Sequence, residues 1–189
     1  MPQLRLEHFS PQMLTPLDLL IEAGETVTLS GPSGSGKSQL LRAIADLDPH
    51  DGMAWLDGVA AEEIPAPQWR RKVGYLPAES HWWRELAADH FTEIPELEAL
   101  GLQQAILQSP VAHLSSGERQ RLAVFRMLQQ NPGALLLDEP TASADPETVR
   151  QLEWLVTHWQ SEDPKRAYVI VSHQDDQIQR MADRTLELG

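Results

Sequence analysis

The stretch Gly31-Pro-Ser-Gly-Ser-Gly-Lys-Ser38 decides which fold this chain is expected to have. A glycine, four residues and then Gly-Lys-Ser form a loop whose backbone amides converge on phosphate oxygens. Glycines suit this loop because it visits positive φ and because a Cβ would keep the backbone away from the phosphates. The candidate nucleotide-binding residues here are Gly31, Pro32, Ser33, Gly34, Ser35, Gly36, Lys37, Ser38 and Gln39.

The residues around the loop support this interpretation. Thr26–Leu29 is apolar and β-branched and predicts a strand, and Gln39–Ala45 predicts a helix whose N-terminus adds its positive dipole end to the phosphate site. Lys37 would place a cation at the β- and γ-phosphates, and Ser38 would offer its hydroxyl to a magnesium ion. The loop therefore predicts binding of a nucleoside triphosphate, but kinases, GTPases, helicases and transport ATPases all share it.

Composition narrows the function. The chain has 189 residues, enough for one α/β domain, and its 15 basic and 28 acidic residues give a net charge of −13. Such acidity disfavours nucleic-acid binding, which needs basic residues against phosphates. The absence of cysteine excludes disulfides and thiolate sites. No apolar run approaches the roughly 20 residues of a membrane helix, so any membrane connection is expected through a partner protein.

Strand and helix patterns alternate along the chain, with one interruption. We expect a nucleotide-binding core from residues 1–78 and 114–189, and an insertion at 79–113 made of mostly helical stretches that prolines interrupt. The predicted strands are Leu4–Phe9, Leu17–Ile21, Thr26–Leu29, Met53–Leu56, Val73–Leu76, Ala134–Leu137 and Tyr168–Val171. A further helix is expected over Thr148–Gln160.

Leu135-Leu-Leu-Asp-Glu139 is the second informative motif. An apolar strand that ends in two acids places both carboxylates at its carboxyl end, where ligands bind in parallel sheets. Asp138 would bind magnesium, directly or through water. Glu139 would polarise an attacking water, and general-base assistance of this kind contributes about 10²–10⁴ in rate. Without the upstream loop, the two acids could equally be a solvated turn.

The third motif is Leu114-Ser-Ser-Gly-Glu-Arg-Gln-Arg121, which precedes a predicted helix. Ser115 and Gly117 lie at the helix entry, where free amides and a hydroxyl can hold an anion. The alternative is an ordinary capping box between Ser115 and Glu118. Placed shortly before the Asp138-Glu139 motif, however, the stretch resembles the signature sequence of ATP-binding cassette (ABC) ATPases, Leu-Ser-Gly-Gly-Gln.

Two further stretches extend the resemblance over nearly the whole chain. Thr141-Ala-Ser-Ala-Asp-Pro146 resembles the D-loop of ABC ATPases, and His173, beyond a buried strand, resembles their switch histidine. The resemblance implies a P-loop NTPase core of ABC type with a small antiparallel β subdomain and a short helical subdomain. It also implies ATP and Mg²⁺ as cofactors, and catalytic roles for Glu139, His173 and Lys37.

The same resemblance implies two partners. One is a second cassette, identical or not, that pairs head to tail with this one in an ATP-dependent manner. Ser115 and Gly117 would then contact the γ-phosphate bound by the opposite chain. The other is a membrane-spanning permease, which would hold the chain at the inner, cytoplasmic face of a membrane. A soluble ABC ATPase unconnected to transport, or a regulatory cassette with little hydrolysis, remain the alternatives.

Several positions depart from the family pattern. The family usually has a glutamine after the strand that is Val73–Leu76 here; Ala78 occupies its place, and substitution by Glu79, one residue later, is the alternative. Ser116 replaces a signature glycine, which could tighten or distort that loop. No tyrosine or tryptophan precedes the phosphate loop to stack an adenine: Met13 lies nearest in register, and Phe9 is the only nearby aromatic ring.

Two adjacent tryptophans begin the insertion. Trp82 and Trp83 cannot both face one helical core, because neighbouring residues on a helix diverge by about 100°. One of them could be exposed and line a docking groove for a cytoplasmic helix of the permease. Burial of both in a small irregular subdomain is the equally weighted alternative.

Overall fold

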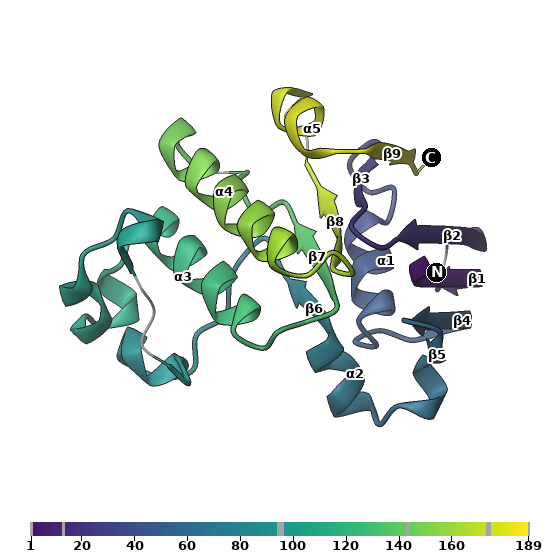
Figure 1. The fold of residues 1–189 in the computed structure, drawn as a ribbon, viewed down its shortest axis with the longest axis horizontal. Coiled ribbons are helices and arrows are strands. Elements are labelled where there is room, and N and C mark those ends of the chain that lie inside the picture. Colours follow the sequence, from purple (N-terminus) through teal and green to yellow (C-terminus); the bar gives the residue numbers. More distant parts are fainter. Residues whose placement is uncertain (1, 13, 94–96, 143, 173–174, 189) are drawn as a thin grey trace.

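The described strands form two sheets with helix α1 between them (Figure 1). The structure is a computed structural model that describes residues 2–12, 14–93, 97–142, 144–172 and 175–188. One sheet is antiparallel with the strand order β2-β1-β4-β5, and the other is parallel with the order β6-β7-β8-β3-β9. This arrangement matches the nucleotide-binding core and antiparallel subdomain expected from the sequence.

The element bounds extend most of the predicted ranges by one or a few residues. The strands are β1 (Pro2–Pro11), β2 (Leu17–Glu22), β3 (Thr26–Ser30), β4 (His50–Leu56), β5 (Val59–Ala60), β6 (Val73–Leu76), β7 (Ala134–Asp138), β8 (Ala167–Val171) and β9 (Arg184–Glu187). The α-helices are α1 (Lys37–Ile44), α2 (Ala66–Lys72), α3 (Ser116–Leu128), α4 (Pro146–Glu162) and α5 (Asp175–Met181). The short elements β5, α2, α5 and β9 were not expected from the sequence.

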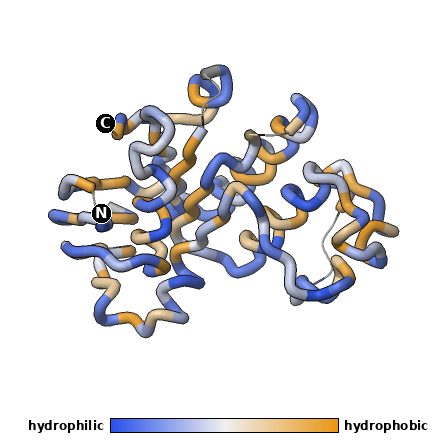
Figure 2. The backbone as a smooth tube through the Cα atoms, turned by 180° about the vertical axis from the view of Figure 1, so that it is seen from behind, coloured by the Kyte–Doolittle hydropathy of each residue, from blue (hydrophilic) through white to orange (hydrophobic). Residues whose placement is uncertain are grey.

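Different layers cover the two faces of the parallel sheet. Leu136 and Val169 belong to the core shared with α1 and the antiparallel sheet. Their neighbours Leu135, Leu137 and Ile170 belong to a second core with α3 and α4. Because successive side chains of a strand point to opposite faces, a strand buried on both sides is apolar along its length, as β8 is and as β7 is up to its last residue, Asp138. Figure 2 shows these hydrophobic strands in the middle of the molecule.

The insertion at 79–113 differs from the helical stretches expected. Its described part holds no α-helix, only short 3₁₀ turns: η2 (Ala87–His90), η3 (Leu97–Leu100), η4 (Gln104–Gln108) and η5 (Val111–His113). The prolines explain why, because Pro110 lacks an amide and ends one turn where the next begins. Apolar residues of these turns pack with α3 and α4. Across the described residues, every helix is too short or too polar to cross a membrane.

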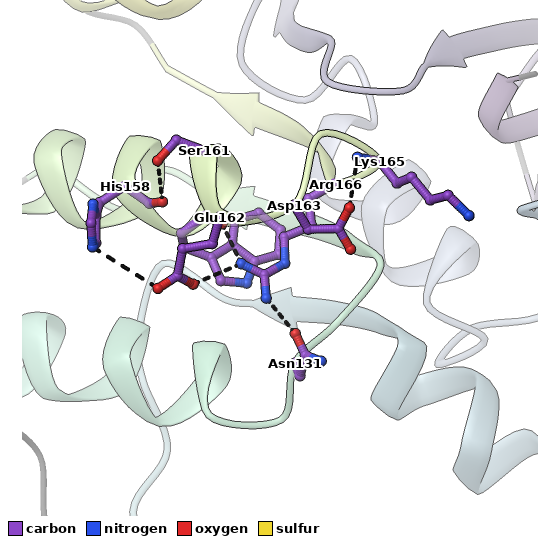
Figure 3. A network of polar contacts seen from close by, with 8 residues as sticks. Asn131, His158, Ser161, Glu162, Asp163, Lys165 and Arg166 are labelled. Carbon is purple, nitrogen blue, oxygen red and sulfur yellow. Dashed lines mark hydrogen bonds and ion pairs between the residues drawn. The ribbon is translucent and has the colours of Figure 1, made fainter.

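Arg166 connects the end of α4 to the residues before β7 (Figure 3). Its guanidinium donates to Asn131 Oδ1 at 2.5 Å, to Glu162 Oε2 at 2.9 Å and to the carbonyl of Trp159. It also lies 4.9 Å from the centre of the Trp159 ring, and its side chain is only 12% exposed. One cation therefore holds together two segments that are adjacent in space but distant in sequence.

Replacing Arg166 by alanine should lower the free energy of unfolding by about 1–3 kcal/mol, because hydrogen bonds to a charged, largely buried group are lost together. Urea unfolding followed by circular dichroism measures this. Arg70→Ala is the matched control: the Arg70–Asp46 pair is 47% and 39% exposed, and such pairs contribute about 0–1 kcal/mol. Equal losses in the two variants would contradict the role given to Arg166.

Candidate functional site

The phosphate loop joins β3 to α1 in a conformation that requires glycine. Gly31, Gly34 and Gly36 have φ of 140°, 84° and 90°. A Cβ at Gly31 would lie 2.1 Å from the carbonyl oxygen of Leu188, and one at Gly36 would lie 2.4 Å from Leu14. Substitution at either position would therefore force backbone or packing to shift, whereas Gly34 faces open space.

Lys37 begins α1 and reaches back across the loop. Its Nζ donates to the carbonyl oxygens of Gly31 at 2.9 Å and Pro32 at 3.0 Å, and the residue is only 6% exposed. These contacts hold the ammonium group inside the loop. The cation is thus placed at the centre of a curved backbone, where an anion would meet it.

The rest of the loop has donors that suit phosphate. The hydroxyl oxygen of Ser35 is buried and has no hydrogen-bond partner among the described residues. Leu40 donates to Gly36, so the amides of residues 37–39 belong to the first helical turn, which leaves its N–H groups without intrahelical acceptors. Ser38 and Gln39 are exposed. An oxygen-rich anion would satisfy these groups together.

Asp138 ends β7 and is held by Tyr75 of the neighbouring strand β6. The Tyr75 hydroxyl donates to Asp138 Oδ2 at 3.0 Å, and Asp138 is 5% exposed. Burial, with the negative charge of Asp138 nearby, raises the pKa of Tyr75, so the phenol stays protonated and remains a donor. Ser38 and Asp138 carry the oxygen atoms that would suit Mg²⁺, an ion usually held by few protein groups together with phosphates and waters.

Glu139 follows directly in an uncommon backbone conformation. Its φ is 48°, a left-handed value that costs a non-glycine residue roughly 1–2 kcal/mol. Its amide donates to the carbonyl of Val171 at 3.1 Å, which fixes the turn against β8. Strain of this kind is often found where a side chain must be aimed. The predicted switch residue His173 lies outside the described residues, although Ser172 before it is described and buried.

The signature stretch forms the start of α3. Ser115 is the N-cap, and a complete capping box links it to Glu118: the Ser115 hydroxyl accepts from the Glu118 amide at 3.2 Å, while the Ser115 amide donates to Glu118 Oε2 at 2.7 Å. The capping alternative is therefore confirmed, which leaves the anion-binding role as a prediction. The expected distortion at Ser116 is wrong, because Ser116 starts a regular helix and needs no positive φ.

Comparison with known proteins places this geometry in a family. A family model described as "ABC transporter" matches residues 14–142. The chain belongs to the ABC transporter family. Protein STAR1 of Oryza sativa subsp. japonica is 37% identical, over 95% of this chain and 56% of its own length. The lipoprotein-releasing system ATP-binding protein LolD of Psychrobacter arcticus is 36% identical, over 95% of this chain and 88% of its own.

Solved structures agree on the fold. A dimeric ATP-binding cassette in a post-hydrolysis state, bound to ADP and Pi, superposes with a TM-score of 0.83 at 24% identity and covers 98% of this chain and 94% of its own. An ATP-binding subunit of an ABC transporter gives a TM-score of 0.86 at 21% identity, covering 98% and 85%. These structures confirm the ABC-type fold, while the family match and the relatives above confirm the functional class predicted from the motifs.

The D-loop of this ABC protein is joined to its signature helix. Asp145 caps α4, and its carboxylate accepts from the amide of Thr148 at 3.0 Å and from its hydroxyl at 2.7 Å. These bonds, the side-chain one first, lower the pKa of Asp145. A Cβ at Gly117 would lie 3.3 Å from the same hydroxyl. The glycine therefore lets the signature helix pack closely on the residue that Asp145 fixes.

Gln177 of α5 is a site residue that the sequence analysis missed. It is 1% exposed, and its Oε1 accepts from the hydroxyls of Thr141 at 2.9 Å and Ser172 at 2.7 Å. These two residues follow Glu139 and precede His173, so one buried amide fixes the backbone on both sides of the site. Only the position of Gln177, four residues after His173, could have suggested this from the sequence.

A groove of about 960 Å³ separates the residues after β6 from the start of α3. Ala78, Glu79, Trp82, Arg84 and Arg119 are among its lining residues. Ala78 and Glu79 are exposed, so the position of the family's glutamine opens onto this groove. The side chains of the described insertion and the signature helix thus meet at one surface.

The two tryptophans do not both enter a core. Trp83 is 67% exposed and Trp82 is half-buried on the groove. The guanidinium of Arg126 from α3 lies 4.4 Å from the Trp82 ring centre and 4.7 Å from that of Trp83, and His90 meets both rings edge-on. Burial of both tryptophans is therefore the wrong alternative. Arg126 instead holds the first turn of the insertion against α3.

The adenine-stacking question is partly answered. Phe9 is fully buried and packs against the ring of His50 at 4.3 Å, so it cannot offer a face to a base. Met13 lies outside the described residues. Leu14, which packs against Gly36, is the described side chain nearest the loop on this segment.

The free energy of unfolding should depend less on pH in Glu118→Gln than in the wild type. Hydrogen bonds from the Ser115 side chain and backbone lower the pKa of Glu118 below its usual 4.5. The carboxylate therefore stabilises the fold above that value, and the contribution is lost as the pH falls through the folded-state pKa. Urea unfolding near pH 7 should find the variant less stable by about 0.5–1 kcal/mol, and the difference should shrink as the pH is lowered below the usual pKa of the carboxyl.

The matched control is Glu62→Gln, an exposed carboxylate on the 3₁₀ turn η1 (Ala61–Glu63). A difference between wild type and Glu118→Gln that stayed constant with pH would show that the Glu118 charge takes no part in the cap.

Proposed function

We propose that this chain hydrolyses ATP and that its phosphate loop, Asp138 and Glu139 act as one site. The supporting observation is the register of three neighbouring strands. Val171 of β8 is paired with Asp138 of β7 on one side and with Leu29 of β3 on the other. Strands lie about 4.8 Å apart, so the acids and the start of the loop emerge roughly 10 Å from each other at one edge of the sheet.

That spacing suits a terminal phosphate and its metal ion. Lys37 and the loop amides would hold the phosphates, and Ser38 with Asp138 would hold Mg²⁺. The ion, when bound, offsets charge on the phosphate oxygens. Glu139 would accept a hydrogen bond from the attacking water and orient it in line with the bond to be broken, with His173 assisting by the family resemblance.

A second cassette would complete the site. The relatives of known fold include a dimeric cassette, and the start of α3 presents Ser115 and Gly117 at an exposed or half-exposed helix entry. Free amides at a helix N-terminus suit the γ-phosphate held by an opposite chain. We therefore place Ser115 and Gly117 in a shared site that forms when two cassettes close on ATP.

The groove beside Ala78 would bind a permease and so keep the chain at the inner face of a membrane. It exposes an aromatic ring, Trp82, between charged residues of both signs, Arg84, Arg119 and Glu79. An aromatic anchor inside a polar rim is typical of protein interfaces. An amphipathic helix of the partner is the segment that such a groove fits.

Glu139→Gln should lower steady-state phosphate release by about 10²–10⁴, because the group that orients the water is lost. ATP binding should persist, and ATP should now hold the chain as a stable dimer, visible by size-exclusion chromatography with light scattering. Lys37→Ala is the control, since it should weaken nucleotide binding itself. If wild type and Glu139→Gln release phosphate equally slowly, the chain binds ATP without turning it over and is a regulatory cassette, as Ala78 would favour.

Trp82→Ala should weaken docking to the permease. The measurement is the fraction of each variant recovered with membranes when the chain is co-expressed with a polytopic membrane protein chosen from its gene neighbours. Loss of an aromatic anchor costs about 2 kcal/mol or more, roughly 30-fold in affinity. Trp154→Ala is the matched control, an exposed tryptophan on α4 outside the groove. If Trp82→Ala and Trp154→Ala were recovered with membranes to the same extent, the groove would not be the surface that binds the permease.

A further inference from the structure

A line of polar side chains runs from helix α1 to the magnesium candidate Asp138. Tyr75 is paired with Leu136, so Asp138, two residues further along β7, lies on the same face of the sheet as Tyr75. That face packs against α1. The Tyr75 hydroxyl donates to Asp138 Oδ2 at 3.0 Å, in a half-buried position.

Arg42 of α1 lies beside this phenol. Its guanidinium holds Asp48 with two bonds of 2.7 Å, and, against the larger effects of burial and of Asp138, its positive charge is near enough to Tyr75 to lower the pKa of the phenol. A phenol hydroxyl has one proton to donate, and Tyr75 donates it to Asp138, so the partial negative charge of its oxygen remains for the nearby cation. Arg42 also lies four residues after Ser38, on the same face of the helix.

We propose that Tyr75 is a positioning residue that holds Asp138 with one oxygen occupied and the other, Oδ1, directed to the metal ion. Arg42, on the helix that carries Ser38 and held in place by Asp48, keeps a positive charge beside the Tyr75 hydroxyl. The two oxygen ligands on β7 and α1 are thereby tied to each other through side chains as well as through the backbone. This inference rests on the proposed function, because it assigns the geometry of the same site.

The contact between Tyr75 and Asp138 matters more in this chain because Ala78 replaces the glutamine usual in the family. An alanine has no group for a metal ion or a water, so position 78 adds no ligand to the proposed pair of Ser38 and Asp138. Asp138 must then be held in one rotamer by its neighbours. Partners of this kind, one step removed from the ion, commonly change metal affinity by about 10–100-fold when they are removed.

The test is a magnesium titration of ATP binding, followed with a fluorescent ATP analogue. Tyr75→Phe keeps the ring and removes only the hydroxyl, so we expect the Mg²⁺ concentration for half-maximal effect to rise about 10-fold or more. Binding of the nucleotide in EDTA should not change. Tyr168→Phe is the matched control, since Tyr168 is the other tyrosine of the chain and is buried at the far end of β8.

A second pair of variants separates positioning from general destabilisation. In an Asp138→Asn background, Tyr75→Phe should bring no further loss of magnesium dependence, because its effect passes through Asp138. Arg42→Met leaves Tyr75 in place and should give a smaller shift in the same direction, which also serves if Tyr75→Phe does not fold. The proposal would be overturned if Tyr75→Phe left the Mg²⁺ concentration for half-maximal effect unchanged. It would also be overturned if Tyr75→Phe raised that concentration as much in the Asp138→Asn background as in the wild type. Absence of magnesium-dependent binding in the wild type would instead overturn the proposed function.

Discussion

The burial of β7 on both faces is the constraint on which the site depends. Each residue from Ala134 to Asp138 is buried, with one core formed by α1 and the other by α3 and α4. A strand packed in this way cannot slip by one residue without turning every side chain to the opposite core. The strand end is therefore fixed, and with it the positions of Asp138 and Glu139. The left-handed turn at Glu139 uses that rigidity to aim its side chain.

Rigid strands alone do not determine how side chains at their ends are oriented. Here polar contacts from two neighbouring elements fix the residues at the strand ends. Tyr75 holds the Asp138 carboxylate from β6, and Gln177 holds the residues that follow Glu139 and precede His173 from α5. Both groups are uncharged and both are partly or fully buried. Tyr75 thus orients the Asp138 carboxylate, and Gln177 fixes residues beside Glu139, without adding charge to the site proposed to bind a phosphate.

The sequence predicted the parts of this molecule that local chemistry specifies. β6 was placed at its observed bounds, and the unbroken apolar runs identified β7 and β8, because strands buried on both faces are apolar at every position. The 79–113 segment could not be predicted, since its short turns are stabilised by packing against α3 rather than by their own periodicity. Tyr75 and Gln177 escaped notice for a related reason. Their roles depend on partners 63 and 36 residues away.

Arg126 joins the start of the 79–113 insertion to helix α3. Its guanidinium lies over the rings of Trp82 and Trp83, and burial lowers its pKa, while its Nη2 donates to the carbonyl of His81 at 3.0 Å. The residues after Ala78 are thereby attached to the helix that begins at the signature. In a family where a glutamine usually contacts the nucleotide site, this chain has an alanine but a strong link to α3. In the proposed shared site, movement of the groove would thus reach the phosphate held by the opposite cassette through α3 more directly than the phosphate of its own.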